Sequence, residues 1–195
     1  ALNEKPELLK SCGRPAIDTQ VEIRDENDNP LPIGEIGQIC AKGPQIMKGY
    51  WNKKEESEKA LKGGWMHTGD AGRMDEEGFV FIQDRIKDMI VSGGENIYST
   101  EVEAALFAHP DVVDAAVIGV PDEKYGEVVK ACIVKKEGSN VTEADLISFC
   151  KDRIASYKKP QSVDFIDEVP RNASGKVLKK VLREPYWKDQ ERQVS

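Results

Sequence analysis

Closely spaced turn residues divide the first 85 residues into short apolar segments, a pattern that favours short strands over long helices. These turn residues are Asn29, Pro30, Pro32, Gly34, Gly37, Gly43 and Pro44. Between them, Val21 and Ile23 alternate with polar neighbours, as in a strand that buries one face. We therefore expect residues 1–85 to form a small antiparallel, β-barrel-like subdomain, interrupted by one helix at residues 52–61 that Asn52 caps.

After about residue 86 the pattern changes to that of a second domain, residues 86–195, in which helices flank a short β-sheet. Segments rich in β-branched residues predict strands, and Thr142 stands where an N-cap residue would begin the clearest helix. The expected elements are a helix at 99–110, strands at 111–122 and 127–136, a helix at 141–155, a strand at 162–166 and a helix at 176–184. The expected fold class is therefore α+β.

The first helix of this second domain carries two signals of its own. Thr100 and Glu103 have the spacing of a capping box, in which each side chain bonds the backbone of the other residue. Val102, Leu106 and Phe107 share one helical face, which is typical of a helix that packs on a core.

The composition limits the partners of the chain. Its 195 residues, 39% of them hydrophobic, can bury one core of ordinary size or two smaller ones. The net charge of −7 argues against nonspecific nucleic-acid binding, which requires lysines and arginines that neutralise phosphates. No stretch reaches the roughly 20 apolar residues that cross a bilayer, and the first residues lack the pattern of a signal peptide. We expect a soluble, cytoplasmic protein without a transmembrane segment.

The cysteines and histidines show no pattern of metal ligation. Cys12, Cys40, Cys132 and Cys150 lie far apart, without the Cys-x-x-Cys or Cys/His spacing of metal sites. His67 has no partner at a spacing typical of a catalytic triad or a metal site, and we interpret it as structural. The cysteines are interpreted as reduced structural thiols rather than as a disulfide or metal site, so no metal ligand is predicted.

Basic residues gather toward the end of the sequence. Residues 151–183 carry nine lysines and arginines against four acids, although the chain as a whole is acidic. Within them, PRNASGKVLKK places Gly175 and Lys176 on a loop that enters a helix. The loop is not a Walker A loop, because Val177 replaces the serine or threonine that binds magnesium. Lys176 is suited either to a phosphate contact or to a basic helix start on a solvated face.

Three further motifs each allow two interpretations. Asp70, in HTGD, either accepts the hydroxyls of a ribose or closes a turn. The charged segment 84–88, DRIKD, is either a hinge that exchanges ion pairs or a solvated connector. The paired glycines of SGGEN, Gly93 and Gly94, either bring the backbone close to a ligand or form a hairpin turn.

Taken in order, these motifs resemble one known family. The segments that carry the resemblance are CGRPAIDTQVEI, GEIGQICAKGPQIMKGYWN, GGWMHTGDAG, QDRIKDMIVSGGENIYSTEVE and VPRNASGKVLKK. Together they are similar to the carboxyl-terminal part of the adenylate-forming enzymes, which comprise acyl-CoA synthetases, luciferases and peptide-synthetase adenylation domains. The resemblance covers nearly the whole chain. Because SGGEN is the form associated with CoA ligases, the chain most resembles a fatty acyl-CoA synthetase.

The resemblance implies an activity in two steps. Such enzymes activate a carboxylic acid with MgATP as an acyl-adenylate, releasing pyrophosphate, and then transfer the acyl group to a thiol such as that of CoA. Their small C-terminal domain swings about a hinge between the two steps, so residues 86–195 are expected to move as a domain. ATP, Mg²⁺ and CoA are therefore expected for the complete enzyme.

The resemblance also implies roles for individual residues. Asp70 and Arg85 correspond to the pair that holds the ribose of ATP or AMP, with Thr68 shaping the turn beside them. Lys87 corresponds to the hinge residue, and Lys176 to the catalytic lysine that bridges the substrate carboxylate and the α-phosphate. The residues that correspond to the CoA pantetheine tunnel are Ser92, Gly93, Gly94 and Glu95.

Two parts of the family's active site are missing from this sequence. Neither the Ser/Thr/Gly-rich loop that cradles the triphosphate nor the aromatic-Gly-x-Thr-Glu segment occurs in it. We therefore expect a fragment of a larger ligase, inactive alone. The alternatives are an adenylation domain that loads a carrier protein, and a binding module without chemistry. Exposed surface of the first subdomain would favour dimerisation.

Overall fold

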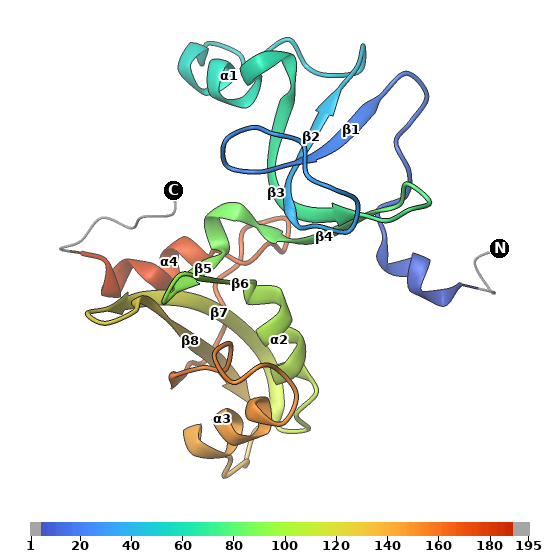
Figure 1. Ribbon diagram of the computed structural model, residues 1–195. Coiled ribbons are helices and arrows are strands. Elements are labelled where there is room, and N and C mark those ends of the chain that lie inside the picture. Colours follow the sequence, from blue (N-terminus) through green and yellow to red (C-terminus); the bar gives the residue numbers. More distant parts are fainter. Residues whose placement is uncertain (1–4, 189–195) are drawn as a thin grey trace. The chain divides into compact units, whose positions relative to one another are not determined.

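The computed structural model describes residues 5–188, which form two compact units, the first ending at Ile86 and the second beginning at Lys87. Each unit has its own β-sheet (Figure 1). Each also has its own cluster of buried apolar residues. The expected α+β fold class is confirmed.

The first unit is built on a four-stranded antiparallel sheet in the order β1-β2-β3-β4. Its strands are β1 (Gln20–Arg24), β2 (Gly37–Lys42), β3 (Met66–Met74) and β4 (Val80–Arg85). The sheet is open rather than closed, because β1 and β4 do not pair with each other within residues 5–188. Four strands are fewer than the roughly five to eight that close small barrels. The antiparallel sheet is therefore as expected, whereas the expected barrel-like closure is wrong.

Short helices connect the strands of the first unit. They are η1 (Pro6–Lys10), α1 (Lys54–Ala60) and η2 (Lys62–Gly64). The expected cap of α1 is wrong: Asn52 has a φ of 54°, and Lys53 takes the N-cap position without a side-chain hydrogen bond. The left-handed conformation of Asn52 turns the chain before the helix begins. The core of the unit contains buried Ile23, Ile39 and Val80, with Val21, Leu31 and Met74 packed against them.

The second unit has a five-stranded sheet in the order β6-β5-β8-β7, with β9 beside β8. Its strands are β5 (Ile90–Ser92), β6 (Glu95–Ile97), β7 (Val112–Asp122), β8 (Gly126–Lys135) and β9 (Ser162–Phe165). β7 and β8 pair antiparallel along nearly their whole length, whereas β9 runs parallel to β8. β7, β8 and β9 lie where the β-branched segments predicted strands.

Helices of the second unit cover both faces of this sheet. They are α2 (Ser99–Phe107), α3 (Glu143–Lys151), α4 (Lys179–Arg183) and η4 (Glu184–Tyr186), whereas the short η3 (Ile86–Asp88) lies at the boundary between the units. The alternation of side chains along β8 divides the core in two, since Val129, Ala131 and Ile133 belong to the cluster that contains α2 and α3. The opposite face contributes Cys132 and Val128 to a cluster with Leu182 and Tyr186.

α3 begins as the sequence predicted. The Thr142 hydroxyl accepts a hydrogen bond from the Asp145 amide at 3.3 Å, and the Asp145 carboxylate accepts one from the Thr142 amide at 2.9 Å. These two bonds form a complete capping box. The buried side of the helix carries Leu146 and Cys150, with Ile147 packed against the core.

α2 differs from its prediction. Its N-cap is Tyr98, without a side-chain capping bond, so Thr100 does not take the expected N-cap position. Glu103 instead accepts a hydrogen bond from the Val117 amide at 2.8 Å and pairs with Lys179 at 2.7 Å. Phe107 is 48% exposed, because the helix ends there and its last residue turns away from the core.

The helices and the cysteines of the chain each show one further feature. None of the helices within residues 5–188 is long and apolar enough to cross a membrane. All four cysteines are unpaired, with Cys12 exposed and the other three buried. Burial raises the pKa of both Cys132 and Cys150 to about 11, so these thiols stay protonated at neutral pH.

Candidate active site

The hairpin of β3 and β4 brings Asp70 and Arg85 together. The two residues are directly opposite in the strand register, and Arg85 Nε lies 2.7 Å from Asp70 Oδ1. A charge-assisted hydrogen bond of this length fixes the carboxylate in place. The side chains remain 23% exposed for Asp70 and 43% for Arg85, so a ligand can reach both.

The turn before Asp70 is shaped by a glycine and a hydroxyl. Gly69 has a φ of 74°, a conformation that other residues rarely adopt. The Thr68 hydroxyl donates to the Ile39 carbonyl at 2.8 Å and accepts from the Asp70 amide at 3.1 Å. The register shifts after Ala71, and such a bulge re-aims the neighbouring side chains. Thr68 therefore orients the strand that carries Asp70.

A pocket of about 500 Å³ opens beside this turn. Its lining includes Gln38, His67, Thr68 and Gly69 from the sheet and Lys53 and Lys59 from the α1 region. The volume lies within the range of small-molecule sites, roughly 300–1,000 Å³. Glu56 lines the same pocket and pairs with Lys53 at 3.1 Å, which leaves Lys59 as the second lysine of the lining.

The charged segment at the end of β4 is partly buried and paired. Asp84 and Asp88 are only 7% and 8% exposed. Arg183 in α4 places Nη1 3.2 Å from the Lys87 carbonyl and 3.0 Å from Asp88 Oδ1. These contacts hold the Lys87 backbone and Asp88 against α4 within the second unit. A fully solvated connector would make no such contacts.

The paired glycines form the turn of the β5–β6 hairpin. Gly93 and Gly94 have φ values of 60° and 87°, and Ser92 pairs with Glu95 across the turn. Consecutive left-handed residues are typical of a tight two-residue hairpin, so the backbone itself favours glycine here. The Gly93 amide donates to the Tyr125 carbonyl at 2.9 Å, which ties this turn to the β7–β8 hairpin.

The loop that carries Lys176 is held by an asparagine. Asn172 Oδ1 accepts hydrogen bonds from the Ser174 amide at 3.1 Å, the Ser174 hydroxyl at 2.8 Å and the Lys176 amide at 2.9 Å. The Lys176 side chain is exposed. These Asn172 bonds give the loop a defined turn.

An ion pair braces the same loop from the sheet. Arg171 bonds both carboxylate oxygens of Asp114, at 3.0 and 2.9 Å, and also donates to the Gly175 carbonyl at 3.0 Å. Both carboxylate bonds come from Nη2 and the carbonyl bond from Nη1, so the two nitrogens together fix the arginine plane. Arg171 therefore links β7 to the residue that precedes Lys176.

Comparisons with known proteins identify the family of the chain. The family model described as AMP-binding enzyme matches residues 1–51, and that of the AMP-binding enzyme C-terminal domain matches residues 101–176. The chain is 43% identical, over 96% of its length, to the fatty acid–[acyl-carrier-protein] ligase ScoC of Streptomyces coeruleorubidus. It is 44% identical, over 89% of its length, to a long-chain-fatty-acid–CoA ligase of Escherichia coli. The chain belongs to the AMP-binding, adenylate-forming enzymes.

A solved structure shares the fold. ATP-bound MatB from Rhodopseudomonas palustris matches with a TM-score of 0.85 and 40% identity over 91% of this chain and 36% of MatB. The chain spans 36% of ScoC and 31% of the Escherichia coli ligase. It is thus about a third as long as the AMP-binding enzymes that it matches.

Sequence reasoning missed the residues that support the expected site of this AMP-binding enzyme. The missed residues hold the Lys176 loop and are Asp114, Arg171 and Asn172. No motif spacing connects the distant Asp114 and Arg171. Asn172 had a local signal, since asparagine side chains often bond amides two residues ahead. Asp70 and Arg85 were expected together, and the structure places them together. Their roles, like those of Lys87, Lys176 and the glycine hairpin, remain predictions.

Proposed function

We propose that this chain is part of an ATP-dependent acid–thiol ligase, which activates a carboxylic acid as an acyl-adenylate and transfers the acyl group to CoA. The main support is the Asp70–Arg85 pair, 2.7 Å apart, in a chain of the adenylate-forming family. Arg85 holds one carboxylate oxygen of Asp70. The carboxylate can then accept hydrogen bonds from ribose hydroxyls, the way in which dinucleotide enzymes hold ribose.

In the first step, a carboxylate oxygen of the acid attacks the α-phosphorus of MgATP and the bond to pyrophosphate breaks. Lys176 is proposed to bridge the attacking carboxylate and the α-phosphate, where its ammonium offsets the developing negative charge. Its exposed side chain on a braced turn suits this role, because the backbone is positioned while the ammonium stays free to enter a site.

In the second step, the thiol of CoA attacks the acyl carbon and AMP leaves. Lys176 must withdraw before the thiol can approach the same centre, which is a physical reason for rotation about Lys87. Gly93 and Gly94 are proposed to face the pantetheine, together with Ser92 and Glu95 that flank them. An added Cβ on Gly94 would meet nothing within 4 Å, so the turn offers open space for a ligand.

The acid is proposed to be a fatty acid, in line with the resemblance and with the two fatty-acid ligases among the relatives. A carrier protein is the second candidate for the acyl acceptor, because ScoC is named as a ligase of an acyl-carrier protein. CoA and a carrier protein, supplied separately to a ligase that contains this chain, distinguish the two. Thioester formation with the carrier alone would overturn the CoA proposal.

The mechanism is tested by Lys176→Ala in a ligase that contains these residues, beside Lys180→Ala, an exposed lysine of α4, as the matched control. ATP–pyrophosphate exchange should fall by roughly 10²–10³-fold in Lys176→Ala, the usual loss for one such donor, and stay near wild type in the control. Thioester formation from supplied acyl-adenylate should be retained. Unchanged exchange in Lys176→Ala would remove this lysine from the reaction.

The 195 residues by themselves are proposed to be inactive, because the loop that cradles the triphosphate does not occur in this sequence. Acyl-CoA formation by the purified chain would contradict this. Binding of AMP or CoA by the chain, without turnover, would support the alternative of a binding module in this form. Sedimentation analysis tests the expected dimer.

A further inference from the structure

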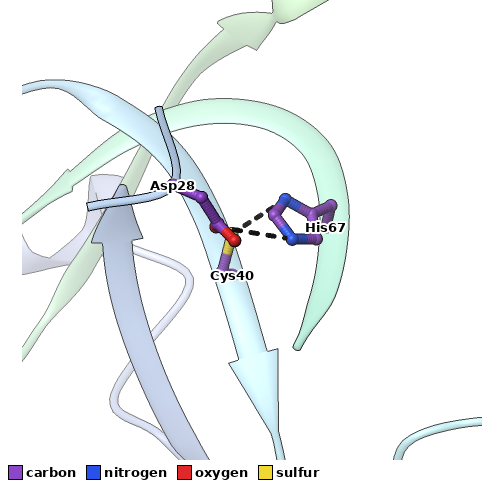
Figure 2. A group of neighbouring side chains, drawn as sticks. All are labelled: Asp28, Cys40 and His67. Carbon is purple, nitrogen blue, oxygen red and sulfur yellow. Dashed lines mark hydrogen bonds and ion pairs between the residues drawn. The ribbon is translucent and has the colours of Figure 1, made fainter. Parts of the chain in front are cut away.

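Three side chains with metal-binding atoms converge in the first unit, outside the Asp70–Arg85 pair. They are Asp28 in the loop after β1, Cys40 in β2 and His67 in β3, and Figure 2 shows them pointing toward one another. Their candidate ligand atoms all lie within 4.8 Å of one another. Cys40 and His67 are direct partners in the β2–β3 register, so the sheet itself holds two of the three.

Hydrogen bonding sets the orientation of the histidine. His67 Nδ1 lies 2.8 Å from Gln38 Oε1, a carbonyl oxygen that can only accept. With this orientation of the Gln38 amide, Nδ1 is the donor, and Nε2 is the nitrogen left to bind a metal. This is the arrangement of a metal-binding histidine, whose second nitrogen donates to a carbonyl or carboxylate outside the metal's own ligands.

The lone pair of His67 faces another acceptor. Nε2 is buried and has no hydrogen-bond partner among the described residues. The nearest charged atom given for it is Asp28 Oδ1, at 3.6 Å. An unprotonated Nε2 and a carboxylate oxygen are both acceptors, and either a proton on Nε2 or a metal ion between them relieves their repulsion. The Cys40 sulfur is beside the same ring, 3.5 Å from Nδ1.

Asp28 is itself held in place. Arg24 Nη1 lies 3.1 Å from Asp28 Oδ1, and Arg24 also pairs with Glu22 at 2.8 Å, which offsets the arginine charge. Hydrogen bonds of this kind orient carboxylate ligands in metal sites. The Asp28 and His67 side chains are 19% and 13% exposed, and His67 lines the pocket beside Thr68, which offers a path for an ion.

We propose that Asp28, Cys40 and His67 bind one zinc ion, through a carboxylate oxygen, the sulfur and Nε2. Zinc prefers this mixture of oxygen, sulfur and nitrogen donors, whereas Mg²⁺ and Ca²⁺ prefer oxygen alone. Donors around a tetrahedral zinc stand roughly 3–4 Å apart. The Cys40 sulfur now lies 3.5 Å from Nδ1, so the His67 ring and the sulfur must move for zinc to bind through Nε2. Three protein ligands leave one position for water.

Binding of the ion keeps the site electrically balanced. The Cys40 thiol releases its proton to solvent and binds as a thiolate. One thiolate and one carboxylate then neutralise the two positive charges of zinc, while the imidazole is neutral. The ion joins β2 to β3 immediately before Thr68, and so fixes the start of the segment that leads to Asp70. This inference does not depend on the proposed ligase activity.

The site was not visible from sequence spacing. The three ligands are far apart along the chain, and only the strand register brings Cys40 opposite His67. The absence of a Cys-x-x-Cys or Cys/His pattern predicted no metal site, and the present proposal differs from that prediction.

The test uses the purified 195-residue chain without an affinity tag, stripped of metal by a chelator and titrated with Co²⁺ alone. We expect one equivalent of Co²⁺ to produce a thiolate-to-cobalt charge-transfer band and the visible bands of a tetrahedral site. One equivalent of Zn²⁺ should then abolish both. A folded wild-type chain without the charge-transfer band would overturn the proposal.

Variants assign the ligands. Cys40→Ser should remove the charge-transfer band, and Asp28→Asn and His67→Gln should each weaken Zn²⁺ binding at least tenfold in competition with a chromophoric chelator. Asparagine tolerates the left-handed backbone at position 28, where φ is 69°, so Asp28→Asn removes the charge without backbone strain. This variant therefore tests the site even where Cys40→Ser does not fold. Cys12→Ser, the exposed thiol, is the control. Wild-type affinity in a folded Asp28→Asn variant, or a lost band in Cys12→Ser, would refute the site.

Discussion

Two neighbouring glycines in the β5–β6 turn have different surroundings, although both have positive φ. A Cβ on Gly93 would lie 3.2 Å from the Tyr125 ring, whereas one on Gly94 would meet nothing within 4 Å. Gly94→Ala should cost about 1–2 kcal/mol of unfolding free energy, the penalty for a left-handed alanine. Gly93→Ala should cost more, because the ring must also move. Urea denaturation of the two variants measures the difference.

The matched control for this pair is Gly94→Asn, since asparagine adopts the left-handed conformation more readily than alanine. It should lose less stability than Gly94→Ala. If alanine and asparagine at position 94 cost the same, backbone conformation would not be the reason for glycine at this turn.

Asp164 on β9 is bonded by two residues, Lys130 and Tyr186, beside the cluster that contains Cys132 and Tyr186. Lys130 Nζ lies 2.6 Å from Oδ1, and the Tyr186 hydroxyl donates to Oδ2. Burial acts to raise the pKa of Asp164, but the hydrogen bonds from Lys130 and Tyr186 outweigh it, so the pKa is lowered. A lowered folded pKa stabilises the protein above the unfolded value, about 3.9, and this stabilisation is lost as pH falls through the folded pKa.

Asp164→Asn should therefore lower the free energy of unfolding at neutral pH and have little effect once the wild-type carboxyl is protonated. The Asp164 side chain is 39% exposed, so water screens the pair and a loss of about 1 kcal/mol is expected. Urea denaturation above and below the ordinary carboxyl pKa measures it. Asp167→Asn, an exposed acid nearby, is the control. A loss that does not change with pH would show that packing, not charge, is responsible.

At the scale of elements, the loop of Lys176 is braced by the Arg171–Asp114 ion pair. Arg171→Lys keeps the positive charge but cannot form both carboxylate bonds together with the bond to the Gly175 carbonyl. In a ligase that contains the chain, adenylation should fall about tenfold, close to 1.4 kcal/mol, with thioester formation from supplied adenylate unchanged. ATP–pyrophosphate exchange and single-turnover thioester assays separate the two steps. An equal loss in both steps would point to general destabilisation instead.

Elements with strong local signals were the predictable ones. β7 and β8 follow from alternating and β-branched residues, and α3 from Thr142, whose partner Asp145 is three residues away. Distant partners override local signals elsewhere. Glu103 has the spacing of a capping box, but Lys179 and the Val117 amide, both remote in sequence, bind its carboxylate.

The candidate site shows the same division between local and distant information. Thr68, Asp70 and Lys176 stand in short motifs, so the family resemblance singled them out. The brace on the Lys176 loop and the Asp28–Cys40–His67 cluster depend on strand register and on loops that meet only in the folded chain. Spacing along a single sequence contains neither.

At the scale of the whole molecule, the chain contains two compact units with separate cores, and each should unfold in its own transition. Tryptophans can report on them separately. Trp65 is 8% exposed in the first unit, and Trp187 donates to the Gly119 carbonyl at 3.0 Å in the second. Both reporter variants carry Trp51→Phe, which removes the exposed tryptophan. A further change at Trp187 leaves Trp65 to report on the first unit, and a further change at Trp65 leaves Trp187 to report on the second.

Zinc should then act on only one of the two transitions, because Asp28, Cys40 and His67 all lie in the first unit. An ion that binds only the folded state stabilises it by about 2.7 kcal/mol at a free concentration of 100 times Kd. The Trp65 transition should move to higher urea in zinc, while the Trp187 transition stays in place. In Asp28→Asn the Trp65 shift should shrink, because the weaker site needs more metal for the same occupancy. Equal shifts of both transitions would instead indicate zinc bound across the surface of the whole chain.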